Sequence, residues 1–426
     1  MLIDTRSSIR FSRATSNFRA LPLALLVWIG YCKHVLLATG SVHTPMWVAL
    51  VSPVILLFSI SSWRMRVPKS ARRWTNAEGE SLLPRLLPEK FATDVLVRAG
   101  GPGAQVRGGI LGKIVLNEAT ANAWRKNESI RNSQYAHECG HIGFGDTVTY
   151  GLLSTGLLLV VVQEVYILFV MGSSSWWLSL CLLVLALGAL RDYSRHRELS
   201  ADRVAAAVVG ASMRQTLDLA PLPDEPRFPF LSTHPTLMER VRALDDPLRI
   251  ASERIALPLF NIGMMTALAV GITYRMLHAF ISTDPRLLTR LALVAIAIPT
   301  SLVISRSIQF AIYALANWVA IRWMASFTFG LLVGTVLARG DWADSATLLS
   351  ALVVLVVLPV ALGAFARAVL FLFAAIDVFS KREVFGGWTQ RLFLAIPFFI
   401  GCWATFEGLW SEWLRMLVVR GVPVWH

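Results

Sequence analysis

The motif His137-Glu138-Cys139-Gly140-His141 is followed shortly afterwards by the apolar run TYGLLSTGLLLVVVQEVYILFVM (149–171). The run is long enough to cross a bilayer, because about 20 apolar residues in a helix span ~30 Å of hydrocarbon. The two histidines stand four residues apart, so they share one face if the segment is helical. This stretch therefore predicts a polar helix with a paired-histidine face that leads into a membrane-spanning helix.

The overall composition also indicates a membrane protein. Hydrophobic residues make up 55% of the 426-residue chain and charged residues 16%, with a mean hydropathy of +0.58. Soluble globular chains average about 45–50% apolar and about 25% charged residues. Several further runs are long and nearly uncharged, and we expect about eight to eleven membrane helices in total.

The net charge of +13 does not by itself indicate a nucleic-acid partner. Arginines flank the first pair of apolar runs on one side, as the positive-inside rule produces in cytoplasmic loops. They are Arg6, Arg10, Arg13, Arg19, Arg64, Arg66, Arg72 and Arg73. We therefore expect the lipid bilayer as a partner and no nucleic acid. The apolar spans and their basic flanks predict a multi-pass protein of the inner (plasma) membrane, and the excess of arginine over lysine indicates a bacterial source.

The chain divides into three expected domains. Residues 1–63 are a basic cytoplasmic tail and an amino-terminal transmembrane hairpin, residues 64–254 are a polar domain interrupted by a transmembrane hairpin at 149–190, and residues 255–426 are a multi-helix membrane domain. Both polar stretches follow an even number of crossings, so they share the cytoplasmic side. The four cysteines show no paired spacing, which predicts no disulfide framework.

Smaller elements are also predicted. In the first polar stretch, strands are expected at 94–98 and 109–116, with a glycine-rich turn between them. The predicted fold class is a polytopic α-helical membrane protein with a small α+β cytoplasmic domain. The expected carboxy-terminal spans lie near 255–277, 287–305, 307–323, 324–338, 346–364, 365–379 and 390–411.

The paired histidines predict a metal site. Two imidazoles on one helical face can bind one ion, and Glu138 stands where it can act on a water bound to that ion. A histidine pair with an adjacent carboxylate base is a metallopeptidase motif. Catalytic zinc keeps three protein ligands and one open position, so a third ligand is expected on the same side of the membrane.

The second polar stretch offers that third ligand. Glu198 and Asp202 are again four residues apart, so one can bind zinc while the other orients a ligand imidazole. The alternative is an ordinary charged helix with ion pairs to Arg195 and Arg197. His234, before Pro235, lies on the same side and is either part of the site or a solvated turn.

The order of these elements resembles the HtpX-type membrane zinc metallopeptidases, gluzincins that are relatives of the CAAX prenyl proteases. The family pattern has HExxH, then a glutamate followed four residues later by aspartate, then a histidine-proline with an arginine six residues after that histidine. His234 and Arg240 match the last spacing. The resemblance covers roughly residues 20–250.

The resemblance implies a role for each residue. His137, His141 and Glu198 ligate Zn²⁺, and Glu138 is the general base. His234 stabilises the oxyanion of the tetrahedral intermediate. Asp202 and Arg240 support the ligands from outside the metal's own coordination. The chain departs from the family in lacking an Asn-Ala-aromatic motif at 103–109 and in its many helices after 255; substrate pairing is expected along the 109–116 strand.

The expected function is a membrane-bound zinc endopeptidase that hydrolyses peptide bonds of membrane proteins or peptides at the cytoplasmic face. Two alternatives stay open from sequence. One is a membrane sensor or transducer whose metallopeptidase site cleaves a regulatory protein. The other is a non-catalytic scaffold that carries a zinc site.

Overall fold

The computed structural model describes residues 5–39, 45–74, 95–100, 103–108, 112–169, 176–218, 234–245, 256–281, 283–312, 317–339 and seven positions between 395 and 403. The described chain is mostly helical, with one small sheet. It divides into two compact units. The first joins Met1–Leu23 to Trp47–Ile250, and the second joins Ala24–Met46 to Ala251–His426.

The first unit holds the sheet and most of the polar helices. After the start of α1 (Thr5–Thr39), its elements are α2 (Met46–Arg64), β1 (Arg72–Arg73), β2 (Val95–Arg98), β3 (Ala104–Arg107), β4 (Lys113–Asn117), α4 (Glu118–Lys126), α5 (Glu128–Phe144), α6 (Asp146–Phe169), α7 (Trp176–Val209), α8 (Ala211–Asp218) and α9 (Leu237–Asp245). Residues 5–19, expected as a tail, are the first turns of α1.

The sheet corrects one sequence-based expectation. Its order is β1-β2-β4-β3, with β2 and β4 parallel and the other pairs antiparallel. The expected 94–98 strand is β2, and the described part of the expected 109–116 strand forms β4; residues 109–111 lie outside the described residues. Because β4 lies between β2 and β3, its main chain is already paired on both sides, and substrate pairing along it was a wrong expectation. Among the described strands, β1 and β3 form the two edges, and β3, which the sequence did not predict, is the edge strand next to β4.

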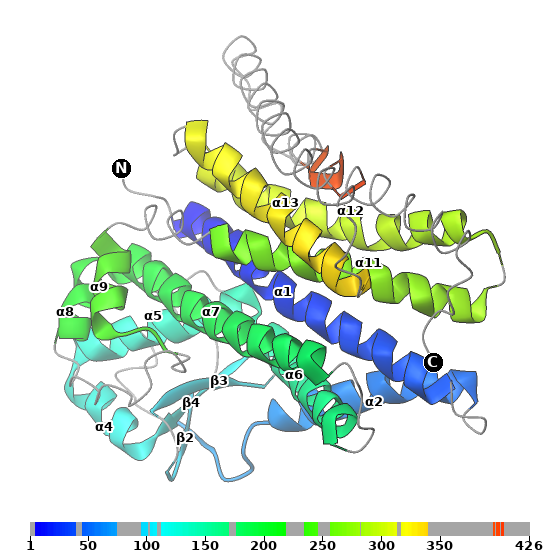
Figure 1. Cartoon of the computed structure of the whole chain (residues 1–426). Helices are drawn as coiled ribbons and strands as arrows, with labels where there is room; N and C mark the ends of the chain where they lie inside the picture. Colours follow the sequence, from blue (N-terminus) through cyan, green and yellow to red (C-terminus); the bar gives the residue numbers. More distant parts are fainter. Residues whose placement is uncertain are drawn as a thin grey trace. The chain divides into compact units, whose positions relative to one another are not determined.

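Helix α5 packs on both of its sides. Tyr135 and Cys139 join the core with the sheet residues, whose buried members include Ile114 and Leu116. Ala136, one position further round the helix, packs with Ala205 of α7 and with α8. The α5 helix therefore lies between the sheet and α7 (Figure 1), which leaves one helical face for the two histidines.

The expected hairpin at 149–190 is built from α6 and α7. The α7 helix does not end at residue 190 but continues to Val209, so one helix carries both the apolar segment and the polar segment with Glu198. Across the described ranges, five helical segments are long and apolar enough to cross a membrane. They are Asn17–Thr39, Met46–Arg64, Asp146–Phe169, Leu257–Phe280 and Pro285–Ser305.

The second unit is helical where it is described. It contains the end of α1 with α11 (Ala256–Phe280), α12 (Pro285–Ile312) and α13 (Asn317–Arg339). The α11 and α13 helices meet at Gly263 and Gly330, where a side chain would collide with the opposing main chain. The bounds expected for the spans 307–323 and 324–338 are wrong. The α12 helix continues to Ile312, and a single helix, α13, covers 317–339. Those at 346–364 and 365–379, and most of 390–411, lie outside the described residues.

Candidate metal centre

The metal motif occupies the second half of α5. The helix begins after Asn127, whose side chain accepts a hydrogen bond from the main-chain N–H of Ile130 at 3.1 Å, the usual arrangement of an N-cap. It ends at Gly145, which adopts the left-handed conformation with φ of 73°. His137 and His141 are 8% and 7% exposed, so both imidazoles are removed from bulk water.

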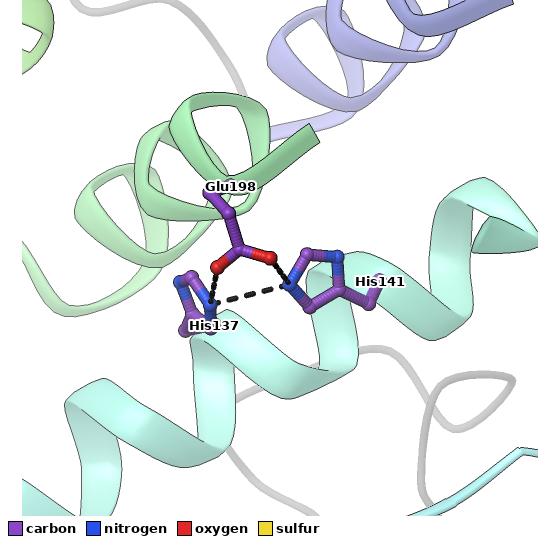
Figure 2. Close-up of side chains that lie close together, drawn as sticks. All are labelled: His137, His141 and Glu198. Carbon is purple, nitrogen blue, oxygen red and sulfur yellow. Dashed lines mark hydrogen bonds and ion pairs between the residues drawn. The ribbon is translucent and has the colours of Figure 1, made fainter. Parts of the chain in front are cut away.

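Glu198 of α7 completes a three-residue cluster with these histidines (Figure 2). The two Nε2 atoms lie 3.2 Å apart, and the Glu198 carboxylate oxygens lie 3.4 Å from His137 Nε2 and 3.6 Å from His141 Nε2. Two ligand atoms at about 2.0–2.1 Å from a tetrahedral zinc ion are about 3.3 Å apart. The cluster therefore has the donor types and the spacing that a zinc ion requires.

Asp202 orients the first imidazole. It is one helical turn beyond Glu198 and fully buried, and its Oδ1 lies 2.8 Å from His137 Nδ1. Arg240 of α9 donates two hydrogen bonds of 2.7 and 2.6 Å to the same carboxylate. If His137 Nδ1 carries the proton, the lone pair of Nε2 points to the cluster, as a metal ligand requires.

Asp146 orients the second imidazole, and the sequence analysis did not single it out. Its Oδ2 lies 2.9 Å from His141 Nδ1, and it is 2% exposed. The left-handed Gly145 turns the chain between α5 and α6, which brings Asp146 back over His141. Arg197, which the sequence predicts only as an ordinary ion-pair partner, also contacts the site. Its Nη2 lies 3.1 Å from Glu198 Oε1, and its guanidinium carbon lies 4.3 Å from the centre of the Tyr150 ring.

The electrostatics of the cluster favour a cation. Burial lowers the pKa of His137, but its bonds to Asp202 and Glu198 outweigh burial and raise that pKa to about 10. Burial raises the pKa of Glu198, but the two imidazoles hold that pKa well below its usual range. The buried carboxylates thus keep positive charge at the position where a metal ion would bind.

Glu138 and His234 lie beside a cavity next to the cluster. The cavity has a volume of about 420 Å³, and its wall includes Glu138, His141, Glu198, His234 and strand β3. Glu138 is 8% exposed, while His234 is exposed at the start of the segment that leads to α9. The structure thus places six of the predicted site residues in the cluster, in this wall or, for Asp202, in hydrogen-bond contact with His137, and Arg240 contacts the site through Asp202. The neighbouring Ser232 and Thr233 lie outside the described residues.

The comparison with known protein families agrees with this geometry. The model of Peptidase family M48 matches residues 86–248. The chain carries an M48 peptidase domain. The match agrees with the family predicted from the motif order and supports a metallopeptidase activity for this domain. The matched residues include α5, α7 and α9, the three helices that carry His137, Glu198 and Arg240. They cover less than half of the chain, and α11 to α13 lie beyond them. No curated protein and no solved structure matches the chain.

Proposed function

We propose that the chain is a membrane-bound zinc endopeptidase that cleaves peptide bonds of membrane proteins or peptides at the cytoplasmic face. The observation that carries the proposal is the shared cavity wall. Glu138 lines the same cavity as His141 and Glu198. These two residues and His137 form the cluster whose spacing suits a tetrahedral ion. A carboxylate at that position is what hydrolysis by a metal-bound water needs.

Each residue has a chemical role in this proposal. Zinc bound by His137, His141 and Glu198 would polarise the scissile carbonyl and lower the pKa of a bound water to about 7. Glu138 accepts the proton of the attacking water and passes it to the leaving amine. His234 donates a hydrogen bond to the oxygen that gains negative charge when the carbonyl is attacked.

The edge strand β3 supports an extended substrate. All four of its residues, Ala104 to Arg107, line the cavity. One side of β3 pairs with β4, and its outer side carries no strand among the described residues. A peptide that adds to this side gains main-chain hydrogen bonds whatever its sequence, and its scissile bond then lies beside Glu138.

The position of the cavity supports a substrate at the membrane surface. Its wall includes Arg64 and Met65 at the end of α2, and Tyr150, Gly151 and Ser154 in the first turns of α6. Both helices are long and apolar enough to cross a membrane. Juxtamembrane segments of other membrane proteins would reach a cavity at this level.

The proposal is tested with the purified full chain in detergent, loaded with zinc and given casein and a quenched peptide library. Glu138→Gln should keep its zinc but lose about 10²-fold or more of the cleavage rate, because a general base contributes at least that much. Glu128→Gln is the matched control, since Glu128 starts the same helix and its side chain is 63% exposed. A chelator should stop the wild type. A Glu138→Gln variant that cleaves peptides at the wild-type rate would refute the mechanism.

A further inference from the structure

Three arginines gather around the cavity-lining edge strand. Arg107, at the end of β3, donates to the main-chain oxygen of Arg64 at 2.6 Å. Arg98, at the end of β2, and Arg107 both reach the same acceptor, Gln105 Oε1, at 3.4 Å for Arg98 and at 3.2 and 3.4 Å for Arg107. The third arginine, Arg64, donates a hydrogen bond of 3.2 Å to the hydroxyl of Thr155. All these acceptors are neutral.

These arginines differ from the others near the site. Arg197, Arg240 and Arg195 each pair with a carboxylate. Within the described ranges, no carboxylate lies within ion-pair distance of Arg64 or Arg107. Burial lowers the pKa of Arg107, and the charges of Arg98 and Arg64 lower it further. Arg64 is exposed, whereas Arg98 and Arg107 are half-buried. Half-buried cations that lie together and have only neutral acceptors are unfavourable unless an anion neutralises them.

The arginines face the place where a substrate would lie. Arg64 and Arg107 line the same cavity as Glu138. Gln105 and Arg107 are two residues apart on β3, so their side chains leave the strand on one face. The outward main-chain N–H of Gly108 is bonded to the oxygen of Met65, so a peptide strand added to β3 would lie opposite Gln105, at about 5 Å between Cβ atoms, with Arg107 at its end. A carboxylate there could accept two parallel hydrogen bonds from a guanidinium.

We propose that Arg107 and Arg64 select a substrate carboxylate, so that the enzyme prefers peptides with an acidic group beside the scissile bond. This inference rests on the proposed function and names its substrate class. The carboxylate can come from an aspartate or glutamate side chain, or from the carboxyl terminus of the substrate. Because a hydrogen bond between a guanidinium and a carboxylate is about twice as strong as one to a neutral group, replacing the carboxylate by an amide should lower kcat/KM roughly 10- to 100-fold.

The test uses pairs of quenched peptides that differ only by Glu or Gln at one position, walked along the sequence. A second pair differs only by a free or amidated carboxyl terminus. The wild type should prefer the acid roughly 10-fold or more in one of these sets, and that set identifies the source of the carboxylate. Arg107→Gln should abolish the preference, and Arg107→Glu should transfer it to a peptide with Lys at that position. Arg125→Gln, an exposed arginine of α4 outside the cavity wall, is the control that should keep it.

Binding provides a readout that is independent of hydrolysis. The same peptides, labelled with a fluorophore, are titrated into the zinc-loaded Glu138→Gln chain with and without Arg107→Gln. Binding that favours the acid only when Arg107 is present supports the inference even if no peptide is cleaved, in which case the proposed hydrolysis alone fails. Equal binding and cleavage of acid and amide peptides overturns the inference. It is also overturned if Arg107→Gln only weakens association with vesicles of phosphatidylglycerol and phosphatidylcholine, since the arginines would then serve the lipid surface.

Discussion

Replacement of Asp146 tests the least expected part of the metal centre. Its carboxylate lies 2.9 Å from His141 Nδ1 and is 3% exposed, so bulk water cannot replace it. Asp146→Asn keeps an acceptor oxygen in place but removes the charge, and Asp146→Ala removes both. The two variants therefore separate the orientation of the imidazole from its electrostatic support.

The expected size follows from two independent considerations. Removing the outer hydrogen-bond partner of a metal-bound histidine typically lowers metal affinity about 10–100-fold, which corresponds to ~1.4–2.8 kcal/mol. A hydrogen bond to a charged group contributes about 1.5–3 kcal/mol. Because Asp146 is buried, solvent screening does not reduce this contribution. We expect Asp146→Asn near the lower end of the range and Asp146→Ala near the upper end.

The assay is a competition titration in which the purified full chain and a chromophoric chelator share a limited amount of zinc. Asp245→Asn is the control, because Asp245 pairs with Arg214 at the surface, where both side chains are at least half exposed. Such a pair contributes about 0–1 kcal/mol and has no connection to the cluster. If both Asp146 variants bind zinc as tightly as the wild type, His141 is not oriented by Asp146 and the reasoning is wrong.

Three further predictions concern the ligand cluster and its packing. Glu198→Ala should lose zinc by elemental analysis; full occupancy would show that another carboxylate, such as Asp202, is the ligand. Gly140→Ala would place a Cβ 3.2 Å from Ala201 Cα of α7. Both the Tm and the zinc affinity should therefore fall, with a loss of about 1–3 kcal/mol in the free energy of unfolding. Gly188→Ala is the control and should lower neither, because Gly188 has open space around it. Burial raises the pKa of the Cys139 thiol to about 12, so iodoacetamide near neutral pH should alkylate it only after unfolding, and rapid labelling of the folded chain, detected by peptide mass spectrometry, would contradict this burial.

The fold was predicted best where the pattern was local and long. The apolar runs that form α2, α6, α11 and the second part of α1 were predicted as helices because a span of this kind needs only a continuous hydrophobic sequence. The edge strand was missed for the opposite reason. Ala104–Arg107 is four residues long and carries no run of branched or aromatic side chains, so only its pairing with β4 makes it a strand.

The candidate site divides in the same way. The spacing of His137 and His141, and of Glu198 and Asp202, is a property of single helices and can be read from sequence. Which carboxylate faces the histidines is decided by how α5 packs on α7, where Gly140 allows close approach to Ala201. Sequence alone left this choice open between the two carboxylates, and only the resemblance to a known family assigned it.

By itself, the sequence predicted the metal chemistry: two imidazoles on one helix face and a carboxylate at the next position, since helical geometry requires nothing beyond the local chain. Tertiary structure alone decided which groups surround that chemistry. The turn at Gly145 brings Asp146 onto His141, and the order of the described strands makes β3 an edge strand in the same cavity wall as Glu138. These contacts join residues through chain reversals and strand pairing, whose geometry depends on the packing of the whole unit.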